Sequence, residues 1–297
     1  MKRVLAAMLL CLAQAARAEG PETPPAPAAV APARVVSMNL CTDQLAMLLA
    51  APGQLVSVSH LASDPMSSAM ADRAGEYVMN RGQAEQIFLM SPDLVLAGSY
   101  TSLPTVDLLR RLGVRVVQIP PVTSLQGVAE QMREMGRLLG QDSEGAAMAA
   151  DFEAGLAALQ VPGDQAADPP GGDPQGAEAR VRAVMYYPNG YTTGAGTVAD
   201  DILRLTGFDN IGAEAGISGG GTLPLERLVM AAPQMVVTSH PYPAASRSEE
   251  ILSHPALRAM QARTAVTVMS DADWICGTPY MLRAVAGMRA ARDGITN

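Results

Sequence analysis

The chain has 297 residues, of which 48% are apolar, 17% charged and 4% aromatic, and its formal net charge at pH 7 is −8. This length and composition allow a sizeable core in one large or two medium domains, which excludes wholesale disorder. No apolar run after residue 20 approaches the roughly 20 residues that a transmembrane helix needs. The acidic balance leaves no basic face for nucleic acid. We therefore expect neither membrane insertion nor a nucleic-acid partner.

The N-terminus has the pattern of a cleavable signal peptide over residues 1–18. A positively charged start precedes the apolar run Val4–Leu12, and Ala16-Arg17-Ala18 forms a small-x-small cleavage site. Cys11 lies inside the apolar run after Leu10, where a lipoprotein signal would have a small residue, which argues against a lipid anchor. We expect a secreted, periplasmic protein whose Pro/Ala-rich residues 19–33 form a disordered leader.

From Arg34 onward, strand and helix patterns alternate. The predicted strands are 34–39, 54–59, 93–97 and 114–119, and the predicted helices between them are 42–50, 85–90 and 105–112. Pro92 ends the second helix and Gly113 is a suitable C-cap for the third. This alternation predicts a parallel sheet that is covered on both faces.

The middle of the chain predicts a connection between two lobes. Residues 125–139 and the Ala-rich residues 143–159 have helical patterns, and the Pro, Gly and Asp density of the following stretch prevents regular structure. We divide the chain into an N-terminal lobe (34–140), a linking helix (141–160), a disordered loop (161–178) and a C-terminal lobe (179–297).

The second half repeats the organisation of the first. Its predicted strands are 182–187, 235–239 and 265–269, and its predicted helices are 198–206, 225–230, 248–261 and 279–291. The pattern ExIxxxxPDLV from Glu85 recurs as ExLxxxxPQMV from Glu226, and DQLxxL from Asp43 recurs as DDIxxL from Asp200. An internal duplication would place two sheets on either side of one cleft, with ligands beyond the C-terminal ends of the strands.

Five segments in this order resemble the periplasmic substrate-binding proteins of ABC importers, in the branch that binds cobalamin and iron complexes. They are RVVSMNLCTDQLAMLLA (34–50), NRGQAEQIFLMSPDLVLAG (80–98), TGAGTVADDILRLTGFDNIG (193–212), LPLERLVMAAPQMVVTSH (223–240) and WICGTPYMLRAVAGM (274–288). The resemblance implies an α/β fold of two Rossmann-like lobes with mainly parallel sheets, joined by a single long helix as in class III, with the ligand cleft between the lobes.

The resemblance also implies a function. The protein would be a non-enzymatic, monomeric binding protein with no cofactor of its own. It would capture a metal-complexed small molecule (cobalamin or another corrinoid, haem or a ferric siderophore) and deliver it to an ABC permease dimer. Glu85 and Glu226 each begin a predicted helix, where a carboxylate favours the positive helix end. In the family, acids at these two positions dock the lobes onto basic residues of the permease.

The candidate ligand-binding residues follow the predicted strands. In the N-terminal lobe they are Asn39, Leu40, Cys41, His60, Ser99 and Tyr100; in the C-terminal lobe they are Tyr187, Tyr191, Thr192, His240, Tyr242 and Trp274. The chain has only 3 Phe, 7 Tyr and 1 Trp, so the gathering of aromatic residues at strand ends is informative. Flat rings suit a large planar or chelated ligand, and these loops carry almost no arginine, which favours a corrinoid or haem over anionic siderophores.

The histidines leave the question of metal ligation open. His60 and His240 follow strands in opposite lobes, whereas His254 is expected on a helix surface. They are too few for the cage of a free metal ion, although one His or Tyr would suffice as an axial ligand to a corrinoid or haem iron.

The two cysteines that follow the signal segment, Cys41 and Cys276, come just after predicted strands of opposite lobes. The sequence leaves two alternatives open, a pair of small buried thiols and an inter-lobe disulfide, which an oxidising compartment would allow.

Two other functions are considered. Gly194-x-Gly196-x-x-Ala199 resembles the glycine-rich turn of a nucleotide-using, doubly wound enzyme, but it follows the strand too late and Asp209 comes too early for a ribose contact. The third alternative is a ligand-sensing subunit of a signalling receptor.

Overall fold

The computed structural model describes residues 30–160, 180–240 and 247–296, and residues 31–297 form one compact unit. The expected signal peptide, the leader up to residue 29, the loop at 161–178 and Tyr242 lie outside the described residues. The last residues of the expected leader are ordered, which corrects the prediction. Ala33 donates its N–H to the carboxylate of Asp93, and the carbonyl of the buried Pro32 accepts a hydrogen bond from Gln54.

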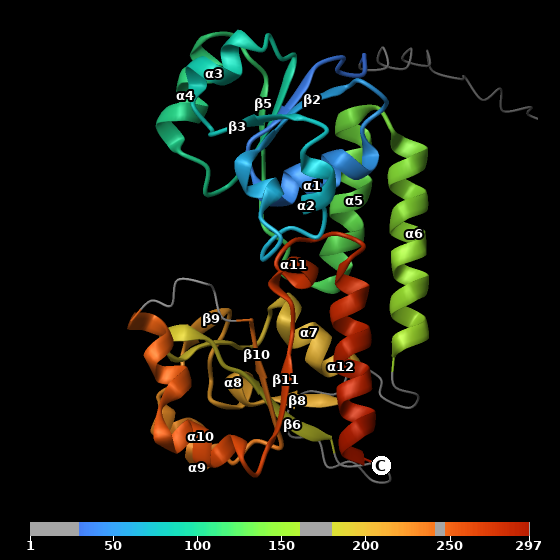
Figure 1. Ribbon diagram of the computed structural model, residues 1–297. Coiled ribbons are helices and arrows are strands. Elements are labelled where there is room, and N and C mark those ends of the chain that lie inside the picture. Colours follow the sequence, from blue (N-terminus) through green and yellow to red (C-terminus); the bar gives the residue numbers. More distant parts are fainter. Residues whose placement is uncertain (1–29, 161–179, 241–246, 297) are drawn as a thin grey trace, which may run out of the picture. The chain divides into compact units, whose positions relative to one another are not determined.

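The first lobe is built on a parallel sheet (Figure 1). Its strand order is β3 (Val78–Asn80), β2 (Leu55–Ser59), β1 (Val35–Ser37), β4 (Leu94–Gly98) and β5 (Val116–Ile119). Its helices are α1 (Leu40–Leu49), α2 (Ala71–Ala74), α3 (Ala84–Leu89) and α4 (Leu103–Arg111), with a 3₁₀ turn η1 (His60–Ser63). Every residue of β4 is buried, as expected for a central strand covered on both faces.

The second lobe has its own parallel sheet, in the order β11 (Ala265–Val268), β10 (Met235–Thr238), β6 (Val181–Met185) and β8 (Phe208–Asn210). An antiparallel ribbon of β7 (Tyr191–Thr193) and β9 (Gly220–Thr222) is added to it. The helices are α7 (Val198–Leu205), α8 (Ile211–Glu214), α9 (Leu225–Ala231), α10 (Pro255–Gln261), α11 (Asp271–Trp274) and α12 (Met281–Thr296), with 3₁₀ turns η2 (Pro188–Gly190) and η3 (Arg247–Ser253).

Helices α5 (Leu125–Leu139) and α6 (Asp142–Leu159) connect the two sheets in sequence. One end of α6 packs on α5 and the other on α12, as Figure 1 shows. Gly136 and Gly145 allow the close crossing of α5 and α6, because a Cβ on Gly145 would lie 2.9 Å from the Cα of Gly136. Farther along α6, Gly155 faces Leu282 of α12.

The two repeated sequence patterns have the same conformation in both lobes. Helices α3 and α9 each begin near the repeated glutamate. Each is followed by a residue with positive φ, Ser91 at 50° and Ala232 at 47°, and then by a buried proline. Each repeated aspartate is buried and bonds to the end of the following strand, Asp43 to Ser59 and Asp200 to Asn210. The recurrence therefore extends from sequence letters to backbone conformation and buried hydrogen bonds.

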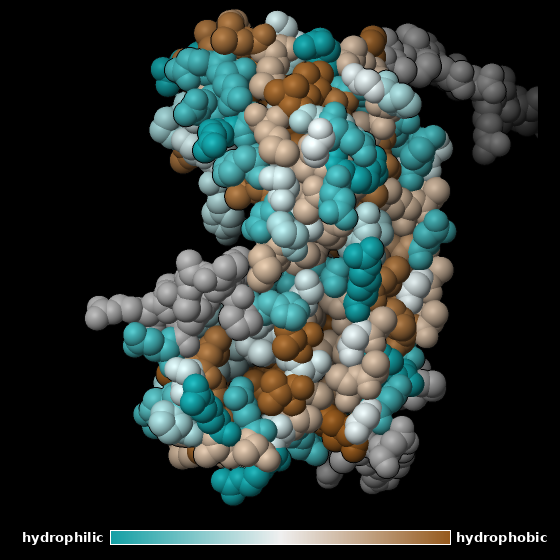
Figure 2. Space-filling model, in the orientation of Figure 1, coloured by the Kyte–Doolittle hydropathy of each residue, from teal (hydrophilic) through white to brown (hydrophobic). Residues whose placement is uncertain are grey.

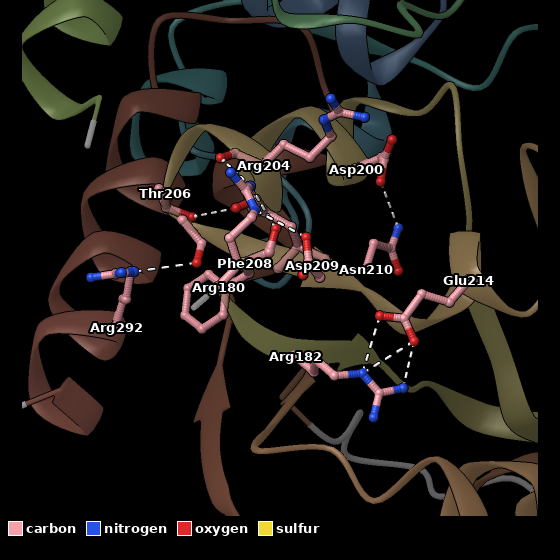
Figure 3. Close-up of polar contacts among 12 residues, drawn as sticks. Arg180, Arg182, Asp200, Arg204, Thr206, Phe208, Asp209, Asn210, Glu214 and Arg292 are labelled. Carbon is pink, nitrogen blue, oxygen red and sulfur yellow. Dashed lines mark hydrogen bonds and ion pairs between the residues drawn. The ribbon is translucent and has the colours of Figure 1, made fainter. Parts of the chain in front are cut away.

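Arginine side chains serve the fold at the N-terminal edge of the second sheet (Figure 3). Arg180 pairs with Asp209 at 2.9 Å, and Arg182 pairs with Glu214. On α12, Arg292 donates to the carbonyl of Gly207. These interactions hold β6, β8 and α12 together at the edge opposite the C-terminal strand ends.

Several short elements differ from the sequence expectation. The single helix predicted over 248–261 is two elements, because Pro255 starts α10 and His254 is its N-cap, accepting from the N–H of Ala256. Four of the three-residue strands, β3, β7, β8 and β9, are absent from the sequence expectation, because segments this short show no clear periodicity. Within the described residues, every helix is too short or too polar to span a bilayer.

Candidate ligand-binding site

The site begins at the topological switch points of the two sheets. In the first sheet β1 lies between β2 and β4, and in the second β6 lies between β8 and β10, so helices leave in opposite directions on either side of β1 and β6. Ligands of open parallel sheets bind beyond the C-terminal ends of the strands at such points. Asn39, Ser99 and Tyr100 follow this edge in the first lobe, and Tyr187 and His240 follow it in the second. Figure 2 shows the surface hollowed between the two lobes on the left of the view.

Asn39 is held by the start of α1 and by β4. Its side-chain oxygen accepts from the N–H groups of Cys41 and Thr42 and caps the helix. Its amide group lies over Gly98, where a Cβ would come within 2.7 Å of Nδ2. Asn39 is half-buried, whereas the next residue, Leu40, is 9% exposed and belongs to the core. The contact of Leu40 with a ligand stays a prediction.

Asp43 is a fully buried carboxylate behind this edge. It accepts hydrogen bonds from the N–H and the hydroxyl of Ser59, the last residue of β2. Burial raises the pKa of Asp43 to about 6, against the lowering effect of hydrogen bonds from Ser37 and Ser59. The carboxylate thereby ties α1 to the strand that precedes His60.

The second lobe presents Tyr191 on its antiparallel ribbon. Tyr191 is 46% exposed, and its ring lies over Gly220, where the lack of a Cβ leaves room for the hydroxyl. The neighbouring Thr192 is fully buried and donates to the carbonyl of Met185 at 2.6 Å. Thr192 therefore holds the ribbon on β6, and its role as a ligand residue stays a prediction.

Tyr187 and Trp274 form an aromatic stack. Their ring centroids are 6.0 Å apart with an interplanar angle of 16°. Tyr187 is buried, and burial raises the pKa of its hydroxyl well above the usual range. Trp274 is half-buried, and its Nε1 has no hydrogen-bond partner among the described residues. Tyr187 thus backs the ring of Trp274, which is the one of the two with exposed area.

Cys41 and Cys276 are joined in a disulfide with their Cα atoms 5.0 Å apart. Of the two alternatives that the sequence leaves open, the structure therefore has the inter-lobe bridge. Cys41 is the second residue of α1, and Cys276 comes two residues after α11. In the chain, the bridge thus lies two residues from Asn39 on one side and two residues from Trp274 on the other.

The remaining candidates are exposed at the strand ends. They are His60, Ser99, Tyr100 and His240. Tyr100 is 90% exposed, so its ring is free to pack on a ligand. No group of three or more His, Cys, Asp or Glu side chains in the described part of the chain is arranged to hold a metal ion.

Glu85 and Glu226 are exposed in the first turns of α3 and α9. Neither carboxylate has an ion pair within the described ranges 30–160, 180–240 and 247–296. Glu226 is near enough to the hydroxyl of Tyr186 to contribute, after burial, to the raised pKa of that group. Both acids are available to a macromolecular partner.

The glycine-rich turn before α7 is a helix entry without the features of a phosphate site. Thr197 caps α7 by accepting from the N–H of Asp200, and Asp200 and Asp201 fill the first turn. Two acids at a helix N-terminus disfavour an anionic phosphate.

Comparison with known proteins identifies the class. The family model described as "Periplasmic binding protein" matches residues 35–269, so the chain belongs to this family of binding proteins. Two curated relatives from Halobacterium salinarum, each named "Cobalamin-binding protein", are 29% identical over 208 residues. The match covers 70% of this chain and 54% of each relative, so the chain spans about half the length of these curated relatives.

Solved structures show the same fold of two lobes with parallel sheets. The periplasmic heme-binding protein RhuT from Roseiflexus sp. RS-1, in apo form, superposes with a TM-score of 0.69 at 21% identity, over 89% of this chain and 99% of that chain. The periplasmic vitamin B12 binding protein BtuF of Vibrio cholerae gives a TM-score of 0.64 at 21% identity, over 90% of this chain and 98% of that chain. The fold class expected from the sequence is confirmed.

Proposed function

We propose that this periplasmic binding protein captures a metal-complexed small molecule and delivers it to an ABC permease dimer. The observation that carries the proposal is the presence of amide, imidazole and aromatic side chains just after strands of both sheets. Asn39 and Tyr100 follow strands of the first sheet and His240 follows β10 of the second, with Tyr191 on the added ribbon and Trp274 on α11. Rings and amides of this kind contact a large, flat ligand over a wide area and orient its polar groups.

The ligand class that fits best is a corrinoid or haem, with ferric siderophores as the third choice. Names of relatives support this class, since they include cobalamin-binding and heme-binding proteins. The candidate strand-end residues are polar and aromatic and include no arginine. An anionic siderophore would favour a site with arginine side chains. His60, His240 or Tyr100 could supply one axial ligand to the metal of such a complex.

A visible-spectrum titration of the purified protein tests the ligand class. Hydroxocobalamin, haemin and a ferric hydroxamate are added separately, and we expect a shifted absorption band and saturable quenching of the single tryptophan with one of the first two. Saturation by the ferric hydroxamate alone would replace the proposed ligand class. An absence of binding to all three would overturn the proposal.

Secretion and the permease partner are parts of the same proposal. The signal pattern over residues 1–18 supports export, and sequencing the N-terminus of protein released from the periplasm tests cleavage after Ala18. The exposed Glu85 and Glu226, one in each lobe, suit a permease with two equivalent subunits. Ligand uptake that does not depend on this protein at all would favour a sensing subunit.

A further inference from the structure

The two lobes are tied together at the edge of the proposed site. Cys41 belongs to α1 of the first lobe, and Cys276 follows the last strand of the second sheet, 235 residues later. The disulfide therefore adds a second covalent connection to the one that the main chain makes through α6.

The segment that carries Cys276 packs on the first lobe beyond the sulfur atoms. A Cβ on Gly277 would lie 3.0 Å from Val122 and 3.1 Å from Gln131, which belong to the connection after β5 and to α5. Gln131 is itself fixed by donating to the carbonyl of Pro120. Cys276 and Thr278 are each 1% exposed. This short segment is thus buried against the first lobe although it follows the second sheet.

The chain returns to the second lobe immediately afterwards. Only Pro279 and Tyr280 separate Thr278 from the fully buried Met281, the first residue of α12. Helix α12 packs on α6, α7 and β11, and Arg292 near its end donates to the carbonyl of Gly207. A displacement of the lobes therefore has to be absorbed within a few residues beside Cys276.

A polar contact reinforces the tie. Asp201 of α7 accepts a 2.9 Å hydrogen bond from the N–H of Leu125, the first residue of α5. Burial raises the pKa of Asp201, because the carboxylate is partly shielded from water between the two helices. A hydrogen bond of this kind breaks and forms readily, whereas the disulfide does not.

We propose that the Cys41–Cys276 disulfide is a clamp that keeps the two lobes in register at the edge of the ligand site. With two covalent connections, the main chain through α6 and the disulfide, the lobes can still rotate about the line that joins these connections. They cannot move apart. The clamp lies two residues from Asn39 and two from Trp274, so it holds in place the residues on both sides that we expect to touch the ligand. Ligand exchange then requires a limited twist of the lobes, and breaking the clamp allows a wider one.

Hydrogen exchange tests the clamp without any ligand. The oxidised protein is compared with protein reduced by a phosphine, which supplies two electrons so that the disulfide takes up two protons and becomes two thiols, and with Cys41→Ser/Cys276→Ser. We expect amides of residues 271–281 and 39–44 to exchange about tenfold faster or more in both altered forms. Thr278→Val is the matched control, because it changes a buried neighbour and keeps the disulfide. Equal exchange in the oxidised and reduced proteins would overturn the proposal.

A chemical bridge keeps the test decisive where the double variant fails to fold. Reduced protein is treated with dibromobimane, in which each thiolate displaces one bromide, so that two C–S bonds link the two sulfur atoms again. We expect the bridged protein to regain the slow exchange of the oxidised form. Continued fast exchange after complete bridging would overturn the clamp, because a covalent link between the two sulfur atoms would then not restrain the lobes.

The effect on ligand exchange rests on the proposed function. Hydroxocobalamin and haemin are bound to each form, and dissociation is followed by recovery of tryptophan fluorescence. We expect the dissociation rate to rise several-fold on reduction and to return after bridging. If neither probe binds the oxidised protein, the proposed ligand class is contradicted. Hydrogen exchange of the ligand-free protein still tests the clamp in that case. If a probe binds and dissociates equally fast from the oxidised and the reduced protein, the disulfide has no role in ligand exchange.

Discussion

The indole of Trp274 stacks on the phenol ring of Tyr187, although the two residues are 87 positions apart in the sequence. Tyr187 is buried in the core, whereas Trp274 is only half-buried. The stack joins the end of β6 to the short helix α11, which comes after the last strand. A rigid aromatic face of this kind costs little side-chain entropy when a ligand binds.

Loss of the indole should weaken binding of a flat ligand. We expect Trp274→Ala to reduce the affinity for hydroxocobalamin or haemin by about 1–3 kcal/mol, as for a buried aromatic contact. Trp274→Phe keeps a ring on Tyr187 and should lose less. Isothermal titration measures both variants, and equal affinities in the wild type and the alanine variant would place the ligand elsewhere.

Gly98 should tolerate no side chain. An added Cβ would lie 2.7 Å from Nδ2 and 2.9 Å from Cγ of Asn39, so Gly98→Ala must displace the residue that caps α1. We expect a loss of about 1–3 kcal/mol in the free energy of unfolding, measured by urea denaturation. Gly287→Ala in α12 is the control, because a Cβ there meets nothing within 4 Å and an alanine favours the helix. A neutral Gly98→Ala would show that Asn39 moves freely.

Ionisation of Asp43 should lower the stability of the protein as the pH rises. Its pKa is about 6 in the folded protein against an ordinary value of 3.8 for an aspartate side chain, so the folded state binds the proton more tightly than the unfolded state. The stabilising contribution is complete below about pH 4 and is lost as the pH rises to about 6, with an upper size of about 3 kcal/mol.

Urea denaturation of the wild type and of Asp43→Asn between pH 4 and pH 7.5 measures this contribution. The asparagine keeps an oxygen that can accept from Ser59, and it does not ionise. We expect the stability of the variant relative to the wild type to increase across this interval. Parallel stability curves for the two proteins would contradict the prediction.

Long, periodic elements were predictable from the sequence, and long-range contacts were not. The sequence predicts the helix over residues 125–139 that the structure shows, because an apolar stripe and the C-cap Gly140 define it locally. Thr192 follows a strand and has a hydroxyl, as a ligand residue would, yet the packing of the ribbon on β6 buries it. The duplicated pattern from Asp43 was visible, whereas its bond to Ser59 depends on the register of α1 and β2.

The two cysteines show the same limit. Their positions after predicted strands allowed both a bridge and two thiols, because nothing in the sequence indicates that the chain after β11 returns to α1. The docking role of Glu85 and Glu226, the ligand contacts and the lobe boundaries stay predictions. The two acids differ from the cysteines in one respect, since they are exposed and the partner that we propose for them is a separate protein.

Removal of both repeated glutamates should block delivery and leave capture intact. Glu85→Gln and Glu226→Gln keep shape and hydrogen bonding and remove one charge from each lobe. Charges at the rim of an interface act mainly on association rate and its salt dependence, so each single variant should reduce uptake in part and the double variant severely.

Asp151→Asn on α6 is the control, because Asp151 is an exposed acid that belongs to neither repeat. Uptake of labelled ligand by cells with the cognate permease measures delivery, and titration of the purified variants measures capture. Because both acids begin helices outside the strand-end edge, ligand affinity should be the same in all four variants. Normal uptake by the double variant would leave these carboxylates with the local role that any acid has at a helix N-terminus.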